Sequence, residues 1–199
     1  MQYPDFSLEY ELLKRYSIVA GIDEVGRGCL AGPVVAAISV VTSENDYYYQ
    51  NVRDSKTLSE KQRNSLSQIL KEKLTDYAIG TASAKEIDQI GIRKATHRAM
   101  LRAYWKLSVV PQVILMDGES ATIPIFSKTY QYNYGDLRHY SIAAASIIAK
   151  VYRDSLMQSL ELQQPGYGFD RHKGYGTKYH YEALKKLGLS NLHRRTFIH

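Results

Sequence analysis

Two apolar runs near the N-terminus predict a pair of strands. Residues 18–23 (IVAGID) form a short apolar run, and residues 33–41 (PVVAAISVV) form a second one that is rich in β-branched side chains. The glycines between the two runs permit a tight connection, as in a hairpin. The polar residues 42–56 that follow predict a loop.

A serine followed three residues later by Gln or Glu marks the start of two predicted helices. The first of these capping boxes, at Ser59, precedes leucine and isoleucine residues at helical spacing and predicts a helix over residues 59–74. The second, at Ser83, opens a helical region that is interrupted near Gly91 and continues to about residue 107.

The second half of the chain alternates strand and helix patterns. The apolar run 113–116 ends in Asp117 and a turn glycine, which predicts a buried strand with a carboxylate at its end. Residues 130–134 predict a further strand, residues 141–163 a long helix rich in small side chains, and residues 178–187 a last helix. These elements indicate an α/β fold, a mixed sheet flanked by helices with a helical segment at the C-terminal end.

The composition is that of an ordinary globular domain. The 199 residues are 44% hydrophobic and 23% charged. No run approaches the ~18 apolar residues that a membrane span needs, and residues 1–14 lack the basic and apolar regions of a signal peptide. The single cysteine, Cys29, excludes an internal disulfide and a multi-cysteine zinc site. We therefore expect one cytoplasmic domain over residues 1–199, without membrane association.

The net charge of +6 is concentrated at the C-terminal end. From Lys150 onward there are nine Lys and Arg residues against four acids, interleaved with tyrosines and histidines. Cations contact phosphates and aromatic rings stack on bases or sugars, so this composition suggests a nucleic-acid surface. A solvated basic helix is the alternative, and charge alone does not separate the two. We expect residues 160–199 to contribute to substrate binding.

Three aspartates share a position at the end of an apolar or aromatic run. Asp23, Asp117 and Asp136 each occupy such a position, and a buried acid is costly unless it is paired or binds a metal ion. An all-oxygen ligand set suits Mg²⁺ or Mn²⁺ rather than Zn²⁺. Any one of these acids could instead begin a turn or cap a helix, but three of them together with a basic C-terminal region favour a metal site.

Two further acids compete for places in such a site. Side chains of consecutive strand residues point to opposite faces, so Asp23 and Glu24 would need a bulge to bind one ion, and Asp23 ranks ahead. Asp154 lies on the inward stripe of the long predicted helix, where Lys150 could pair with it. Reasoning from the residues alone leaves Asp136 and Asp154 both open as the fourth acid.

The glycine-rich turn after the first strand does not have the spacing of a dinucleotide site. Three residues separate Gly28 from the next glycine, and a strand rather than a helix is predicted to follow. Gly26 and Gly28 flank Arg27 and would let the backbone approach a phosphate closely, with the arginine as a donor. Cations held by the carboxylates would then share the phosphodiester with this turn.

Eight segments occur in an order that resembles the type 2 ribonucleases H, specifically the bacterial ribonuclease HII family. They are GIDEVGRGCLAGPVV, DSKTLSEKQR, EIDQIGIRKAT, MDG, GD, SIAAASIIAKVYRD, YGFDRHKGYGT and HRRTF, and they extend from about Val19 to Phe197. The resemblance implies an RNase H-like fold and a two-metal endonuclease that uses Mg²⁺ or Mn²⁺. It implies cleavage of the RNA strand of RNA–DNA hybrids and cleavage 5′ to single ribonucleotides in duplex DNA, leaving 3′-hydroxyl and 5′-phosphate ends. No protein partner is expected to be required.

The resemblance also assigns roles to individual residues. Catalytic and metal-binding roles fall on Asp23, Glu24, Asp117 and Asp136, and a supporting role falls on Asp154. It assigns recognition of the ribonucleotide to Gly26, Arg27 and Gly28. It assigns packing against the neighbouring sugar to Tyr175 and a phosphate contact to Lys56.

The sequence departs from the family pattern at three positions. Cys29, Tyr134 and Ala143 stand where the family usually has proline, lysine and serine, and none of them replaces a matched acid. The related ribonuclease HIII fits less well, because its loop lacks the Gly-Arg-Gly sequence. The remaining alternatives are a non-catalytic nucleic-acid-binding domain and a different metal nuclease on the same fold.

Overall fold

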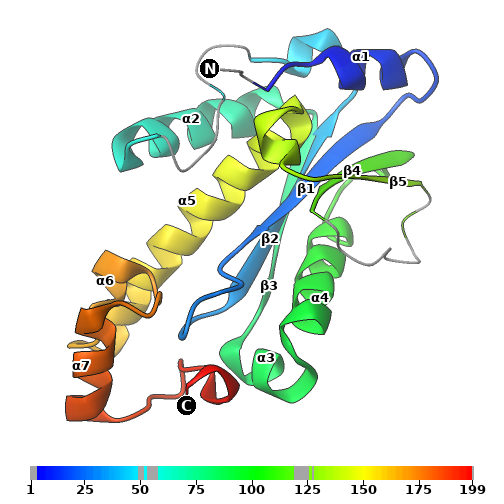
Figure 1. The fold of residues 1–199 in the computed structure, drawn as a ribbon. Helices are drawn as coiled ribbons and strands as arrows, with labels where there is room; N and C mark the ends of the chain where they lie inside the picture. The colour runs from blue at the N-terminus through cyan, green and yellow to red at the C-terminus, as the bar shows by residue number, and fades with distance from the viewer. Residues whose placement is uncertain (1–3, 49–51, 53–57, 119–125, 127, 199) are drawn as a thin grey trace.

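A five-stranded mixed sheet forms the centre of the molecule (Figure 1), in the order β3-β2-β1-β4-β5. The strands are β1 (Val19–Val25), β2 (Val34–Val41), β3 (Asp76–Ala82), β4 (Val113–Asp117) and β5 (Thr129–Tyr132). β2 is antiparallel to both β1 and β3, whereas β4 is parallel to both β1 and β5. This computed structural model describes the chain except for residues 1–3, 49–51, 53–57, 119–125, 127 and 199. The predicted hairpin and mixed sheet are confirmed.

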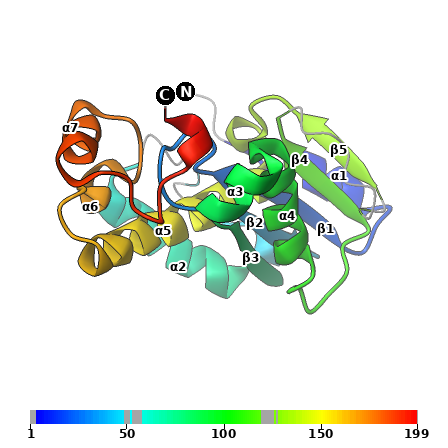
Figure 2. The ribbon, with the colours of Figure 1, turned by 90° about the horizontal axis from the view of Figure 1, so that it is seen from below.

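Helices cover both faces of the sheet, as Figure 2 shows. The helices are α1 (Ser7–Leu13), α2 (Glu60–Lys73), α3 (Ala84–Ile90), α4 (Ile92–Tyr104), α5 (Tyr140–Gln163), α6 (Phe169–His172) and α7 (Lys178–Leu187). α5 packs on β1 and β2 with α2 beside it, and α4 packs on the other face against β2 and β3. None of the helices in the described part of the chain combines the length and the apolar character that crossing a membrane requires.

The central strands are buried on both faces because they alternate their side chains between two cores. Val19 and Val35 pack toward α5, whereas Ala20 and Val34 pack toward α4. A strand with helices on both faces needs a nearly continuous apolar sequence, which β1 and β2 have. The small residues at the start of α5 allow a close approach, and a Cβ at Gly21 would lie only 2.2 Å from the Ser141 backbone.

The predicted helix starts agree closely with the structure. Both capping boxes form, with Ser59 before α2 and Ser83 before α3 accepting from the backbone N–H three residues later. Gly91 separates α3 from α4 with φ 78°, where the left-handed region favours glycine. The predicted strand over residues 130–134 ends at Tyr132 instead, because Tyr134 has a left-handed backbone that starts a turn.

Three of these elements were not predicted from the sequence. β3 is an edge strand whose fully buried positions carry only the small residues Ala78, Gly80 and Ala82, so its apolar signal is weak. α6 is only four residues long, which is too short for a periodic pattern.

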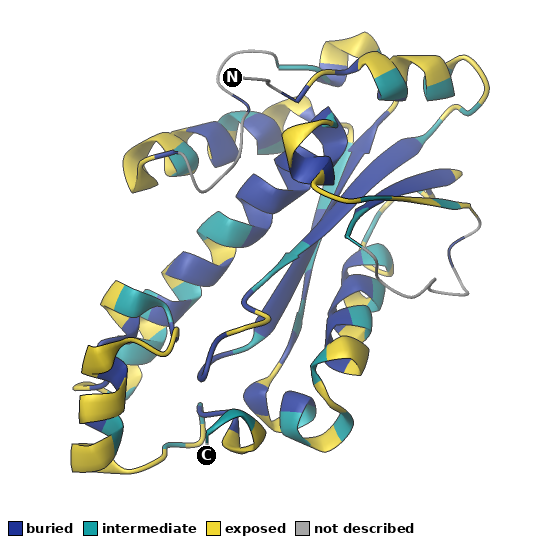
Figure 3. Ribbon diagram, in the orientation of Figure 1, coloured by how far each residue is buried: buried dark blue, intermediate teal, exposed yellow. Residues whose placement is uncertain are grey.

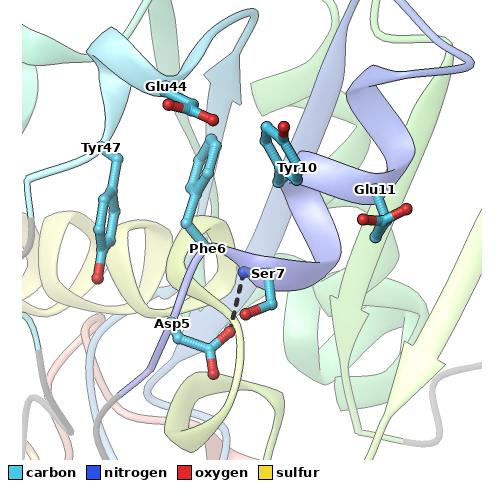
Figure 4. A pocket seen from close by; sticks show the side chains of 7 residues that line it. All are labelled: Asp5, Phe6, Ser7, Tyr10, Glu11, Glu44 and Tyr47. Carbon is cyan, nitrogen blue, oxygen red and sulfur yellow. Dashed lines mark hydrogen bonds between the residues drawn. The ribbon is translucent and has the colours of Figure 1, made fainter.

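The seven residues of α1 are anchored by a tertiary contact, because the buried Glu9 carboxylate accepts from the Ser141 N–H at 2.8 Å. At the start of this helix the Asp5 carboxylate accepts from the Ser7 N–H at 2.9 Å, beside the Phe6 ring (Figure 4).

A small third core joins the C-terminal helices to the end of α5. Phe169 and Tyr167 stack there with ring centroids 5.2 Å apart, next to Met157 of α5. Most of α7 is exposed, as the surface colouring in Figure 3 shows. The C-terminal segment therefore has an apolar attachment to α5 and a polar, largely basic outer surface.

Two buried histidines link this segment to the loop that carries Tyr175. The Ser190 N–H donates to Nδ1 of His193 at 3.0 Å, so His193 carries its proton on Nε2 and donates to Nε2 of His180 at 3.1 Å. His180 then donates from Nδ1 to the Tyr175 carbonyl at 2.9 Å. This network needs both rings neutral, and burial lowers the pKa of both, that of His193 to about 4 with a further contribution from His180.

We expect these histidines to make the protein less stable in acid. Unfolded His193 binds a proton near pH 6.5, whereas the folded ring resists protonation until about pH 4. The unfolded state therefore binds more protons in this window, and the free energy of unfolding falls as the pH falls from 6.5 to 4, by roughly 3 kcal/mol from His193. Urea unfolding of the wild type and of His193→Asn between pH 7.5 and 4.5 measures the difference in slope. Equal losses of stability in both proteins would contradict the assignment.

Candidate active site

The carboxyl ends of β1 and β4 meet at a cavity of about 250 Å³. Ile22 is opposite Met116 in the parallel ladder, so the next residues on each strand, Asp23 and Asp117, emerge side by side. The cavity is lined by Asp23, Glu24, Val25, Asp117, Asp136, Ser146, Lys150 and Tyr175. The structure thus brings together the four acids and the tyrosine selected from the sequence.

Asp23 is the most buried of the acids on the strands. Its side chain is hydrogen-bonded to Ser146, its Oδ1 accepts from the Glu24 N–H at 2.6 Å, and the residue is only 6% exposed. Burial, and then the nearby charges of Glu24 and Asp117, raise the pKa of Asp23 well above its ordinary value. A carboxylate in these surroundings is stabilised when a cation is added.

Glu24 faces the same cavity although β1 has no bulge. Asp23 and Glu24 pair in regular sequence with Ala37 and Ala36 of β2. Both carboxylates can still line the cavity because it lies at the end of the strand and not over one face of the sheet. Glu24 Oε1 accepts from Arg27 at 3.0 Å, and Oε2 is buried with no hydrogen-bond partner among the described residues. Burial raises the Glu24 pKa despite the arginine.

Asp117 fixes the turn that carries Asp136. Asp117 Oδ1 accepts from the Gly135 N–H at 2.6 Å. A Cβ at Gly135 would lie 2.6 Å from the Ile142 side chain and 3.4 Å from this carboxylate oxygen, so only glycine fits without a shift. The short 3-10 helix Gly135–Leu137 then places Asp136, which is buried, at the cavity.

Asp154 is held outside the group of four. Its Oδ1 accepts from Lys150 at 2.8 Å, and Arg63 lies 3.9 Å away. Asp154 does not line the cavity, whereas the side chain of Lys150 does. The structure therefore favours Asp136 as the fourth acid and gives Asp154 the part of holding Lys150 in place.

Arg194 is hydrogen-bonded to the backbone of the Gly-Arg-Gly turn. Its fully buried guanidinium donates to the carbonyls of Gly26 at 2.7 Å, Arg27 at 2.9 Å and Gly32 at 3.0 Å. Burial lowers the pKa of Arg194 to about 10. These bonds direct the turn's carbonyls toward the arginine and give the turn a fixed backbone.

A second buried arginine joins this turn to the loop of Tyr175. Arg153 of α5 donates to the carbonyls of Ala31 at 3.1 Å and Lys173 at 2.8 Å, which lie on the two loops. The Leu30 N–H also donates to the Gly174 carbonyl at 2.8 Å. The two loops therefore form one connected unit beside the carboxylates.

The roles of these two arginines correct one expectation from the sequence. Arg153 and Arg194 count among the basic residues of the C-terminal region, which was interpreted as a nucleic-acid surface. Both are fully buried and bind backbone carbonyls, so neither can contact phosphate. Arg194 lies in the HRRTF segment, in which no local pattern distinguishes a buried arginine from an exposed one.

The remaining predicted substrate residues surround an open space. Tyr175 is 43% exposed at the cavity, beside the buried Cys29, and burial and Cys29 raise its pKa. Gly26 packs against Arg153, where a Cβ would lie 2.2 Å from Nε, whereas a Cβ at Gly28 would meet no described atom within 4 Å. The space at Gly28 is thus left free for a ligand. Lys56 lies outside the described residues.

The donor chemistry of the cavity fits a hard divalent cation. All four acids offer oxygen ligands, as Mg²⁺ and Mn²⁺ prefer, and the partnerless Glu24 Oε2 and the raised Asp23 pKa mark uncompensated negative charge. Within the described ranges, no three His, Cys, Asp or Glu side chains form a ready-made ligand cluster. The four acids nevertheless line one cavity, where Glu24 and Asp117 raise the pKa of Asp23 through their charges.

Comparisons with known proteins agree with this site. The family model described as Ribonuclease HII matches residues 20–199. Ribonuclease HII of Clostridioides difficile (strain 630) is 48% identical over 93% of this chain and 71% of its own. The protein of the same name from Synechococcus sp. (strain CC9902) is 48% identical over 92% of each chain.

Solved structures give the same result for the fold. The crystal structure of ribonuclease H2 from Pyrococcus horikoshii OT3 superposes with a TM-score of 0.77 at 28% identity, covering 90% of this chain and 93% of that one. The family match extends over nearly the whole chain and includes every acid that lines the cavity. The chain belongs to the ribonuclease HII family.

Proposed function

We propose that this ribonuclease cuts the RNA strand of RNA–DNA hybrids and cuts 5′ to single ribonucleotides embedded in duplex DNA, leaving 3′-hydroxyl and 5′-phosphate ends. One observation carries the proposal, namely that four carboxylates share a cavity with an exposed tyrosine. The glycine turn follows directly after the strand that supplies two of these carboxylates, and it is open at Gly28. Residues 1–199 act as one catalytic domain in the cytoplasm, and neither a membrane nor a protein partner is required.

The chain's own residues divide the work of hydrolysis. Asp23, Glu24, Asp117 and Asp136 would hold two ions of Mg²⁺ or Mn²⁺, which would supply activation of water and stabilisation of the leaving 3′ oxygen. Asp23 and Asp136 are buried and Glu24 and Asp117 are partly buried, so their electrostatic attraction for a cation is stronger than it would be in bulk water. Lys150, held by Asp154 at 2.8 Å, adds a positive group at the wall of the cavity.

Recognition of the ribonucleotide is assigned to the backbone of the Gly26–Gly28 turn. A 2′-hydroxyl both donates and accepts hydrogen bonds, so a rigid backbone with free polar groups can distinguish RNA from DNA. Arg194 already donates hydrogen bonds to the carbonyls of Gly26 and Arg27, so the open part of the turn is at Gly28. The exposed lysines of α7 contribute affinity that is independent of sequence and falls with salt.

The test is cleavage of an end-labelled DNA duplex that carries one ribonucleotide, beside an all-DNA duplex, with Mg²⁺, Mn²⁺ or EDTA. We expect one cut on the 5′ side of the ribonucleotide, absent in EDTA and in the all-DNA control. Cleavage of both duplexes would indicate a general nuclease. Binding without cleavage in either metal would indicate a non-catalytic nucleic-acid-binding domain.

Tyr175→Ala is expected to reduce single-ribonucleotide cleavage about tenfold more than cleavage of long hybrids. A stacked aromatic ring contributes about 1–3 kcal/mol per contact, and a long hybrid offers many alternative positions to bind. Measuring kcat/KM on both substrates checks this, with Tyr175→Phe as the matched control that keeps the ring. Equal losses on both substrates would remove the proposed role of Tyr175 at the junction.

A further inference from the structure

A second cavity adjoins the active site at Asp117. It has a volume of about 440 Å³ and is lined by Asp117, Gly118, Asn133 and Tyr134. Asp117 also lines the cavity of the four acids, so the two spaces share a wall. The Tyr134 side chain is 70% exposed at this place.

The backbone of Tyr134 is in a conformation that bulky residues rarely adopt. Its φ of 57° and ψ of 41° lie in the left-handed region, which favours glycine and asparagine. Among the described residues, the only other non-glycine with positive φ is Lys173, two residues before Tyr175. Strained residues of this kind concentrate at functional sites.

The turn explains the backbone of Tyr134 but not its side chain. The left-handed residue starts the 3-10 helix that presents Asp136, and it aims the Gly135 N–H at Asp117. Asparagine or glycine would serve this purpose with less strain. In the described part of the chain no hydrogen bond or ring contact holds this large exposed ring, which indicates that it contacts a ligand.

We propose that the ring of Tyr134 is a stacking platform for a base of the nucleic-acid strand, on the Asp117 side of the scissile phosphate. This inference rests on the proposed function and assigns a further part of the substrate to this site. The described lining of this cavity has no Lys or Arg side chain to bind a phosphate, whereas the exposed ring of Tyr134 is compatible with the face of a base. Aromatic rings bind bases of any sequence, because every base has a π-face.

Together, Tyr134 and Tyr175 place exposed rings in two adjoining cavities that share Asp117. Tyr175 lines the cavity of the acids from the C-terminal loop, and Tyr134 lines the adjoining space beyond Asp117. A strand held at both places would have its backbone directed across the acids. Tyr134 is therefore a binding residue that acts on the position of the substrate rather than on its chemistry.

Tyr134→Asn separates binding from folding, because we expect it to weaken substrate binding without lowering the stability of the protein. Asparagine tolerates the left-handed backbone, so the melting temperature should equal or exceed that of the wild type. The KM for the duplex with one ribonucleotide should rise about tenfold, with a smaller effect on kcat. Tyr134→Phe keeps the ring and should retain most of the binding. Tyr10→Ala, which removes a half-exposed ring from α1 outside both cavities, is the matched control.

A second measurement does not depend on turnover. Duplexes carry 2-aminopurine at single positions on either side of the ribonucleotide, and their fluorescence is followed on binding in EDTA. We expect quenching at one position with the wild type and Tyr134→Phe, and its loss with Tyr134→Asn. Unchanged quenching and KM in Tyr134→Asn would overturn the proposal, as would an equal loss in Tyr134→Phe. Quenching without any cleavage by the wild type would instead contradict the proposed function and leave the stacking site in place.

Discussion

Replacing Asp23 with Asn is expected to abolish cleavage and, at the same time, to raise the melting temperature. The loss of activity should be at least about a thousandfold, because a metal ion contributes several kcal/mol to stabilising the transition state. The gain in stability follows from the raised pKa of Asp23, whose charge is buried beside Glu24 and Asp117. A neutral amide removes that repulsion, and about 1 kcal/mol would raise the melting temperature by roughly 2–4 °C.

The measurements are single-turnover cleavage with Mg²⁺ and thermal unfolding in EDTA. Asp154→Asn is the matched control, because it is also a change from an acid to an amide, but the Asp154 carboxylate is paired with Lys150 at 2.8 Å. It should lower the melting temperature and keep measurable turnover, so the two variants shift the melting temperature in opposite directions and differ in whether turnover survives. Duplex binding by Asp23→Asn should remain largely intact. Substantial turnover in Asp23→Asn would contradict the assignment of this carboxylate to the metal site.

Replacing Arg194 with Met is expected to destabilise the protein by about 3–5 kcal/mol. The change leaves the carbonyls of Gly26, Arg27 and Gly32 without the donor that they have at 2.7–3.0 Å, and each unsatisfied buried group costs about 1–3 kcal/mol. The Gly-Arg-Gly turn should then lose its fixed backbone. Cleavage at single ribonucleotides should fall by more than tenfold, even below the melting temperature of the variant.

Arg195→Met is the control for this experiment, since Arg195 is the next residue but its side chain is exposed. It should change the free energy of unfolding by less than about 0.5 kcal/mol. Arg194→Lys keeps the charge but cannot reach three carbonyls with one ammonium group, and it should lie between the other two. Urea unfolding and kcat/KM on the single-ribonucleotide duplex are the measurements. A stability of Arg194→Met close to that of Arg195→Met would show that the turn does not depend on this arginine.

Capping residues and apolar runs predicted the helices and strands that carry such patterns in their own sequence. The capping serines Ser59 and Ser83 and the apolar runs of β1, β2 and β4 were sufficient to place their elements within a residue or two. β3 was missed because its inward residues are small, and α1 because it is held by contacts rather than by periodicity. The strand predicted to reach Tyr134 stopped early because of a left-handed residue, which no hydrophobic pattern encodes.

The candidate site was predictable in its chemistry but not in its assembly. Periodicity could not decide between Asp136 and Asp154, because the choice depends on the Gly135 N–H reaching Asp117 across 18 residues of sequence. The support from Arg153 and Arg194 was invisible for the same reason. A buried arginine that binds carbonyls looks, in a sequence, like any other basic residue. The resemblance to the family added the residue assignments, which stay predictions until the variants are measured.

The bonds from Arg194 to the Gly-Arg-Gly turn have a consequence for the order of synthesis. The Arg194 to Arg27 contact spans 167 residues, so a ribosome adding about 5–20 residues per second would make the arginine roughly 8–33 s after the turn. From the synthesis of Asp136 onward, the nascent chain carries all four acids of the cavity but not the arginine that fixes the neighbouring turn. The nuclease would therefore mature only when synthesis is nearly finished, and an incomplete chain released before residue 194 would lack a functional recognition loop.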